Sequence, residues 1–177
     1  MRLFIALDLP VSAVDMLCAL QRRLAEAGIG GRAVPRQNLH IPLRFLAEQE
    51  PDKLPLIRQA AQNAMADFAA PMISLTGIGA FIRPGGDTVY AQLGGQLETL
   101  SAMEKRLSQQ LQAIGIAPDM RPFMPHITLM RRARFPSGGG RAAKSEPFFL
   151  SGLGLYASDL SGASPQYERL YHIPLLR

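Results

Sequence analysis

The chain of 177 residues has one cysteine, no tryptophan and only three histidines. A lone cysteine, Cys18, excludes an internal disulfide framework and a cysteine-based zinc site. No apolar run approaches the ~20 residues that a membrane-spanning helix needs. The first ten residues, "MRLFIALDLP", are not a signal peptide, because Asp8 and Pro10 end the apolar run before any small-residue cleavage site. We therefore expect a cytoplasmic protein.

Acidic residues are fewer than basic ones, 14 against 19, and the net charge is +5. The imbalance is concentrated in residues 131–144, "RRARFPSGGGRAAK", which hold five basic residues and no acidic one. This segment is either a solvated surface loop or a basic flap that binds phosphates. It directly follows the predicted strand that contains His126, and this position favours the flap. The glycines at 138–140 lack the Lys-Ser/Thr that a nucleotide-binding P-loop needs.

Hydrophobic residues make up 47% of the chain, enough for a real core. Apolar residues at helical spacing predict three helices, at 11–27, about 52–68 and about 96–114. Apolar runs of strand character predict strands at 2–8, 38–46, 72–82, 87–93, 124–131, 147–157 and 166–173. This order predicts an α+β fold with mainly antiparallel pairing, in which residues 1–177 form one domain of two similar lobes.

One short unit occurs twice: "NLHIPLRFL" from residue 38 and "MPHITLMRR" from residue 124 each contain His-Ile-X-Leu. Side chains alternate faces along a strand. His40 therefore shares a face with Pro42, and His126 shares a face with Thr128. The isoleucine and leucine of each unit point the other way and anchor each strand in its lobe.

Two opposed histidines suit metal-independent hydrolysis of a phosphodiester. Imidazole titrates at about pH 6.5, so one ring can take a proton from water while the other gives a proton to the departing oxygen. The hydroxyl of Thr128 can donate a hydrogen bond to a phosphate oxygen. Either histidine alone could be an ordinary strand residue, but two copies in matching contexts favour a catalytic pair.

Two alternatives come from other classes of protein. A noncatalytic RNA-binding module would use the basic segment, although aromatic residues for base stacking amount to only 7% of the chain. A metal hydrolase would use His40, His126 and His172, but no His-X-X-X-His or carboxylate cluster accompanies them. We expect His172 to lie on the last strand without a functional role, and Cys18 to pack in the core.

The paired unit resembles the signature of the two-histidine (2H) phosphoesterases. Four stretches carry the resemblance in order: "RLFIALDLP", "NLHIPLRFL", "RPFMPHITLMR", and "LYAS" followed by Tyr167. More narrowly, they are similar to the RNA 2′,3′-cyclic phosphodiesterases, also called 2′-5′ RNA ligases. The resemblance implies a bilobal fold, with two antiparallel sheets facing a central cleft and helices outside.

The resemblance also implies the chemistry: RNA ends that carry a 2′,3′-cyclic phosphate are opened to a 2′-phosphate without a metal or cofactor, and a weak reverse reaction joins RNA ends. By this resemblance His126 activates water and His40 protonates the leaving oxygen, while the residue types alone allow the reverse. Thr128 and Arg131 are the implied phosphate ligands. The implied partners are RNA with cyclic ends, such as tRNA fragments, or small cyclic nucleotides; we expect no membrane partner and a monomer.

Three further positions match the family with less defined roles. Phe45 occupies a recurrent aromatic position and is a candidate for the substrate pocket; it either packs in the core, which we favour, or lines the nucleotide pocket. Arg121, in "RPF", is a candidate for the substrate pocket. Tyr167 matches a late tyrosine for which a core or sheet-edge role is equally compatible.

The chain departs from the family at Pro42, which stands where the first threonine belongs. Proline has neither a hydroxyl nor a backbone donor. Loss of one preorganised donor costs roughly 10²–10³ in rate in oxyanion holes. Proline within a strand also predicts an edge or a bulge. Either the enzyme works with a lopsided phosphate site, which we favour, or it has drifted toward weak activity or binding without turnover.

Overall fold

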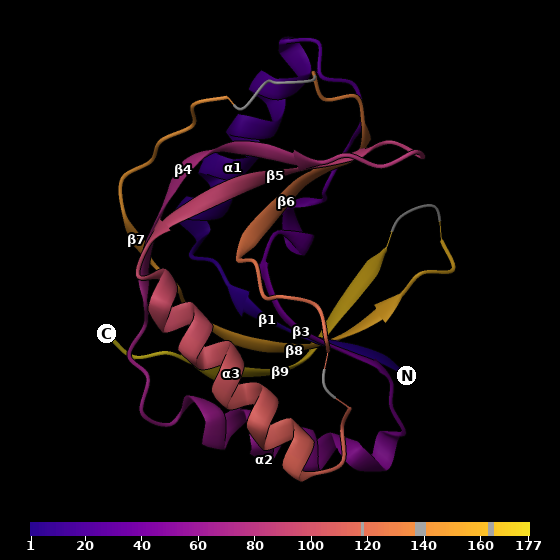
Figure 1. The fold of residues 1–177 in the computed structure, drawn as a ribbon, viewed down its shortest axis with the longest axis vertical. Coiled ribbons are helices and arrows are strands. Elements are labelled where there is room, and N and C mark those ends of the chain that lie inside the picture. Colours follow the sequence, from indigo (N-terminus) through magenta and orange to yellow (C-terminus); the bar gives the residue numbers. More distant parts are fainter. Residues whose placement is uncertain (118, 137–140, 163–164) are drawn as a thin grey trace.

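The computed structural model describes residues 1–117, 119–136, 141–162 and 165–177, and its strands form two antiparallel sheets. The first sheet has the order β3 (Ile41–Glu48), β1 (Arg2–Asp8), β8 (Gly152–Asp159) and β9 (Gln166–Pro174). The second sheet has the order β2 (Arg32–Ala33), β6 (His126–Ala133), β5 (Asp87–Gly95), β4 (Met72–Phe81) and β7 (Phe148–Phe149). The two sheets lie one above the other in Figure 1. The predicted α+β class with antiparallel pairing is confirmed.

The helices are α1 (Val11–Glu26), α2 (Leu54–Met65) and α3 (Leu97–Ala113). α1 follows β1 of the first sheet but packs against β6 of the second, whereas α3 follows β5 of the second sheet and packs against β3 of the first. α2 packs on α3 below the first sheet (Figure 1). These crossed connections tie the two sheets together. No helix in the described ranges is both long and apolar enough to cross a membrane.

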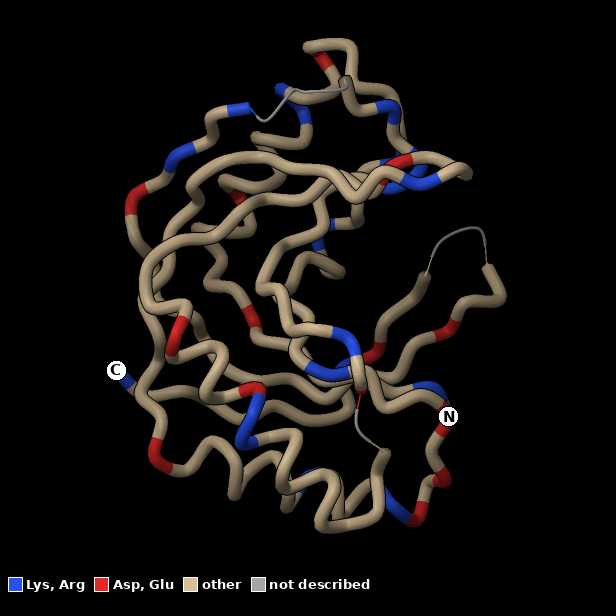
Figure 2. The backbone as a smooth tube through the Cα atoms, viewed as in Figure 1, with Lys and Arg blue, Asp and Glu red and all other residues tan. Residues whose placement is uncertain are grey.

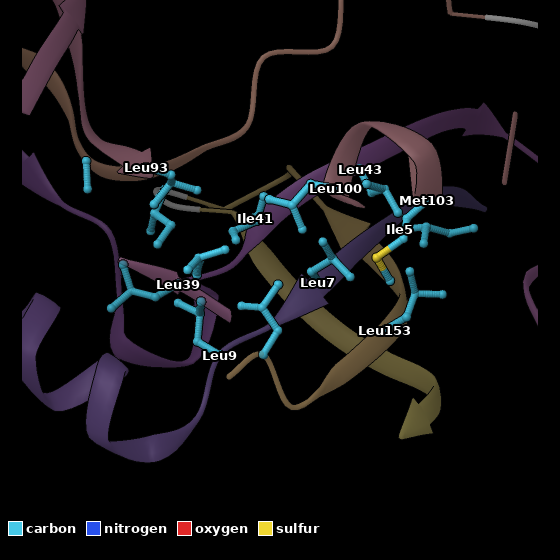
Figure 3. Close-up of a cluster of buried hydrophobic side chains, with 14 of the residues drawn as sticks. Ile5, Leu7, Leu9, Leu39, Ile41, Leu43, Leu93, Leu100, Met103 and Leu153 are labelled. Atoms are coloured by element: carbon cyan, nitrogen blue, oxygen red, sulfur yellow. The ribbon is translucent and has the colours of Figure 1, made fainter. Parts of the chain in front are cut away.

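One part of the buried core lies between the first sheet and the helices beneath it, and the same core continues into the second sheet and α1. Ile5 and Leu7 of β1 and Ile41 of β3 are fully buried and meet Leu100 and Met103 of α3 (Figure 3). Full burial of such a side chain stabilises the fold by about 1.5–3 kcal/mol relative to exposure. The apolar residues that follow each histidine therefore hold its strand in place from behind, as the alternation predicts.

Each histidine strand contains a β-bulge at the third residue after its histidine. In β3 the partners of Ala6 and Ile5 are Pro42 and Arg44, so Leu43 is the extra residue. In β6 the partners of Tyr90 and Val89 are Thr128 and Met130, so Leu129 is the extra residue. An extra residue shifts the alternation of faces by one position. The fifth residue after each histidine therefore shares the histidine's face.

The bulges leave two consecutive residues of each strand buried. In β6 these are Leu129 and Met130, and in β3 they are Leu43 and Arg44. Arg44 is only 5% exposed, and its guanidinium lies 3.2 Å from the carboxylate of Glu104 on α3. A buried charge requires such a partner. This ion pair, which strand periodicity does not predict, joins α3 to the first histidine strand.

Candidate active site

The two histidine rings are oriented by the same kind of hydrogen bond to the backbone. His40 immediately precedes β3 and His126 begins β6. The Nδ1 atom of each ring lies within hydrogen-bond distance of a carbonyl oxygen two residues earlier: 2.8 Å to Asn38 and 2.7 Å to Met124. Because a carbonyl can only accept, each Nδ1 carries a proton and donates it. Each Nε2 is therefore free to exchange a proton with a ligand.

The histidines line two adjoining hollows. The hollow beside His40 has a volume of about 90 Å³ and the one beside His126 about 660 Å³. Both hollows share the same four lining residues, which are Pro42, Phe45, Thr128 and Arg131. These four side chains come from β3 and β6, the strands that carry the histidines. A group bound at the junction would therefore lie between the two imidazoles.

Phe45 and Arg131 reach this junction because of the bulges. The prediction that Phe45 packs in the core is wrong, since its side chain is 46% exposed and lines both hollows. Strict alternation would have placed it with Ile41 and Leu43, but the extra residue turns it to the face of His40. Arg131 is turned to the face of His126 in the same way. Among the described residues no carboxylate pairs with Arg131, so its charge is available to a ligand.

Arg121 lines the hollow of His126. Its guanidinium donates two hydrogen bonds to Asp119, at 2.9 and 2.6 Å, and lies 5.3 Å from the centre of the Phe45 ring. The bonds from Arg121 lower the pKa of Asp119 to about 2. Most of the Arg121 charge is thus neutralised, and the guanidinium presents a flat surface above an aromatic ring.

Aromatic rings back the His40 imidazole from the first sheet. The ring centres of Phe4 and Tyr167 lie 5.1 and 5.7 Å from it, and Tyr156 stacks on Phe4 at 5.1 Å. Tyr167, for which the sequence allows a core or a sheet-edge role, lines the hollow of His40. Phe4 and Tyr156 were not predicted, because in the sequence they belong to ordinary apolar strands.

A smaller aromatic pair backs His126 from the second sheet. Phe81 and Tyr90 stack at 4.5 Å, and both present their rings edge-on to the imidazole, at 5.3 and 5.5 Å. Tyr90 lies so close over Gly79 that a Cβ atom there would meet the phenol ring at 2.7 Å. A glycine inside a strand is a sequence signal for such a close approach.

Burial makes both imidazoles poor proton acceptors in the ligand-free protein. It lowers the pKa of His40 to about 4, against the opposing hydrogen bond to Asn38 and the charge of Asp8. Burial also lowers the pKa of His126, and the positive charge of Arg131 adds to the effect. Both rings are therefore neutral at pH 7. An anionic ligand at the junction would favour protonation of either ring.

One other prediction about the site is corrected. Of the predicted basic flap, Arg131 alone among the described residues lines the hollows; the chain near Arg141 instead pairs with Ile78 of β4 and runs past that strand on the left of Figure 2. The glycines at 138–140 lie outside the described residues. His172 lies on the last strand, β9, as predicted, and its Nδ1 atom lies 2.9 Å from the carboxylate of Asp8.

Pro42 lines both hollows together with Thr128, and it shares the face of His40, as the alternation predicts. The predicted edge position is confirmed: β3 ends the order of the first sheet, and the bulge at Leu43 follows directly. At an edge, the missing amide proton of proline costs little pairing. The first histidine strand therefore tolerates the proline, but it presents no hydroxyl to the cleft.

The chain is similar to known proteins over most of its length. A model of the 2′-5′ RNA ligase superfamily matches residues 13–138. An RNA 2′,3′-cyclic phosphodiesterase of Aeropyrum pernix is 32% identical over 120 residues, which are 67% of this chain and 66% of that protein. One from Geobacillus stearothermophilus is 28% identical over 149 residues, 81% of this chain but 47% of that protein. The chain thus spans less than two thirds of either relative.

The crystal structure of Escherichia coli LigT complexed with 3′-AMP has a TM-score of 0.76 to this fold and 27% identity, with 99% of this chain and 98% of that chain covered. The fold and the two opposed histidine strands thus define a two-histidine phosphoesterase. Within that class, the chain belongs to the 2′-5′ RNA ligase superfamily.

Proposed function

We propose that this protein is an RNA 2′,3′-cyclic phosphodiesterase, which opens the cyclic phosphate at an RNA end to a 2′-phosphate. The observation that carries the proposal is the junction between the two hollows. There two imidazoles with free Nε2 atoms, from separate sheets, flank a threonine hydroxyl and an arginine whose charge is available. The relatives named for this activity and the LigT complex with 3′-AMP support it.

In the proposed reaction, His126 takes a proton from water as the water oxygen bonds to phosphorus. The bond between phosphorus and the ribose 3′ oxygen breaks, and His40 gives a proton to that oxygen. Thr128 donates a hydrogen bond and Arg131 supplies positive charge to the phosphate oxygens as negative charge develops. The two rings exchange protons with solvent to return to their starting states. The reverse reaction would join RNA ends through a 2′-5′ bond.

The hollow beside His126 is the proposed nucleotide pocket. Phe45 offers an exposed ring for stacking, and Arg121 lies above that ring. Arg83, whose guanidinium no described carboxylate pairs with, lines the same hollow and gives it a further positive charge. This combination of aromatic and cationic groups suits a nucleotide next to the reacting phosphate. RNA ends, including tRNA fragments, or small cyclic nucleotides are the proposed partners of a cytoplasmic monomer.

We also propose that residues 1–177 act as one domain whose halves correspond. In each half a strand leads through a helix to a histidine strand that pairs with the first strand: β1, α1 and β3 in one, and β5, α3 and β6 in the other. Catalysis needs both halves, since each supplies one imidazole.

The test is incubation with an oligonucleotide that ends in a 2′,3′-cyclic phosphate, in the presence of EDTA. We expect turnover that the chelator does not reduce, and a product with its phosphate on the 2′ oxygen, located by nuclease mapping or mass spectrometry. A 3′-phosphate product would contradict the proposed roles. Loss of turnover in EDTA, restored by a divalent metal, would favour a metal hydrolase.

A noncatalytic or weakly active RNA-binding homologue remains the second candidate, because Pro42 leaves the cleft one hydroxyl short. It predicts RNA binding that survives the double substitution His40→Ala and His126→Ala, with no turnover by the parent protein. Binding is measured by fluorescence anisotropy with an oligonucleotide that carries the cyclic phosphate. Turnover by the parent that the double substitution abolishes would exclude this candidate.

A further inference from the structure

Asp8, at the end of β1, is a buried carboxylate that the proposed reaction does not use. Its residue is 7% exposed, and three side chains converge on its oxygens. Tyr156 donates a short hydrogen bond from its hydroxyl, His172 approaches with Nδ1 at 2.9 Å, and Arg169 lies at 3.5 Å. A buried carboxylate with this many donors is an organised site, since an unpaired charge there would be strongly unfavourable.

Two glycines of β8 make this cluster possible. A Cβ atom on Gly154 would lie 2.3 Å from the ring of Tyr156, and one on Gly152 would lie 2.3 Å from the ring of His172. Both rings therefore lie flat against the strand and reach across it to Asp8. Any larger residue at either glycine would push a ring away. The two glycines of "GLGLY" at 152–156 thus leave the room that His172 and Tyr156 need to reach the carboxylate of Asp8.

The cluster is next to His40 in two ways. Leu7 of β1 pairs with Ile41 of β3 in antiparallel fashion. Asp8 follows Leu7 and His40 precedes Ile41, so Asp8 and His40 are neighbours just beyond that pair. The ring that Asp8 holds is also part of the stack behind the imidazole, because Tyr156 stacks on Phe4 and Phe4 lies 5.1 Å from His40.

The charged and titratable groups around the two histidines differ. Facing His40 are Asp8 of β1, Tyr156 and Tyr167 of the strands beyond, Arg32 of β2, and His126 and Arg131 of β6. Burial lowers the pKa of His40, and Asp8 is the described carboxylate whose charge opposes this. For His126, the charge that acts on its pKa is that of Arg131, which lowers it further after burial.

We propose that Asp8 is a positioning residue for His40, which fixes the Tyr156 ring behind the imidazole and supports the protonated, acid form of His40. The inference rests on the proposed function for its catalytic meaning. His172 and Arg169 hold the carboxylate in place from β9, and they partly neutralise it. Among the described residues, no carboxylate plays this part for His126.

The test is NMR titration of the three histidines in the wild type and in Asp8→Asn, with excess inorganic phosphate to hold the cleft in an anion-bound state. Asparagine keeps the shape and the acceptor oxygen but removes the charge. We expect His40 to bind a proton about threefold less tightly in Asp8→Asn, because a nearby opposite charge is lost, and His126 to be unchanged. Asp15→Asn, an exposed carboxylate on α1, is the matched control and should move neither ring.

Kinetics on the cyclic oligonucleotide give a second readout. In Asp8→Asn the high-pH limb of the kcat profile should move to lower pH while KM stays constant, since the acid loses its proton sooner. Tyr156→Phe, which keeps the ring and the fold but loses the bond to Asp8, should lower kcat several-fold with KM unchanged. An unmoved His40 titration in a folded Asp8→Asn, movement of the low-pH limb instead, or a wild-type kcat in Tyr156→Phe would each overturn the proposal.

The two proposals fail separately. The titration needs no turnover, so a wild type without phosphodiesterase activity would refute the proposed function while the coupling between Asp8 and His40 is still measured. If Asp8→Asn does not fold, the kcat of Tyr156→Phe decides the positioning role.

Discussion

The two histidine strands share one sequence pattern and one backbone geometry, but they surround their imidazoles differently. The carbonyl that holds His40 belongs to Asn38, which is 5% exposed and whose side chain donates a 2.9 Å hydrogen bond to the carbonyl oxygen of Pro165. The carbonyl that holds His126 belongs to Met124, which is 44% exposed. The comparison shows that the repeated unit sets the direction of each ring. The neighbours set how firmly the ring is held and how readily it binds a proton.

The proposed phosphate ligands of the two strands are unequal as well. Thr128 offers a hydroxyl at the position where the other strand has Pro42, and Arg131 offers a charge where the other strand has Phe45. The second sheet therefore supplies the polar contacts of the junction and the first sheet supplies apolar ones. An anion at the junction would be bound mainly from the side of His126.

The largest effect should come from removing either imidazole. We expect His40→Gln and His126→Gln each to lower kcat on a cyclic-phosphate oligonucleotide by about 10²–10⁴, the usual contribution of a general acid or base. The double variant should lose little more, because the two rings act in one step. Single-turnover assays measure this. Full activity in either single variant would show that its imidazole takes no part in the reaction and would contradict the paired mechanism.

Thr128→Val should have the next largest effect. Its hydroxyl is the one motif donor left at the junction, so we expect kcat to fall by roughly 10² or more. Thr76→Val, an exposed position on β4, removes the same group elsewhere and should leave kcat unchanged. If Thr128→Val retains full activity, then Arg131 carries the phosphate contact alone.

Pro42→Thr tests the first histidine strand by giving it the hydroxyl that it lacks. A second hydroxyl opposite Thr128 should raise kcat about tenfold, less than the full value of an isolated donor because Thr128 and Arg131 already contact the phosphate. Pro42→Val separates the hydroxyl from the change in backbone, since it restores the amide without the oxygen. Equal rates in the threonine and valine variants would mean that this cleft does not use a donor at position 42.

The last effect concerns stability in acid rather than catalysis. Since the pKa of His40 falls from about 6.5 unfolded to about 4 folded, the unfolded state binds more protons between these values. The free energy of unfolding should therefore fall as the pH drops from 6.5 to 4, by at most about 3 kcal/mol at about 1.4 kcal/mol per pKa unit. Urea titrations at pH 7 and pH 4.5 measure this, and His40→Gln should remove most of the dependence.

The corresponding His126→Gln variant should keep more of the acid dependence than His40→Gln does. Burial lowers the pKa of both rings, but the carbonyl that holds His126 belongs to an exposed residue and the one that holds His40 to a buried residue. An acid dependence that disappears in His126→Gln but persists in His40→Gln would mean that His126, and not His40, is the ring whose pKa folding lowers more.

Sequence periodicity predicted most of the elements because their apolar stripes are long. β1 occupies the predicted residues 2–8, α1 ends within one residue of its prediction, and both histidine strands lie where the repeated unit is. The predicted strand at 147–157 is instead divided into β7 and β8. β2, with two residues, is too short to leave a periodic signal.

The site was less predictable where it depends on departures from regular geometry. The face of Phe45 follows from a bulge, which depends on how β3 pairs with β1 rather than on the residue types within β3. The role of His172 follows from Gly152 on the adjacent strand, 20 residues earlier in the chain, which leaves room for the ring. Such features arise between strands and are not visible in either strand alone.

The bulges at Leu43 and Leu129 have one more consequence. Deletion of either residue would remove the bulge and return its strand to strict alternation, while every side chain beyond it would keep its present face. Without Leu43, Arg44 would follow Pro42 directly and stay buried, and Phe45 would still face the cleft. One extra residue in each half therefore explains why the fifth position after the histidine, rather than the fourth, faces the cleft.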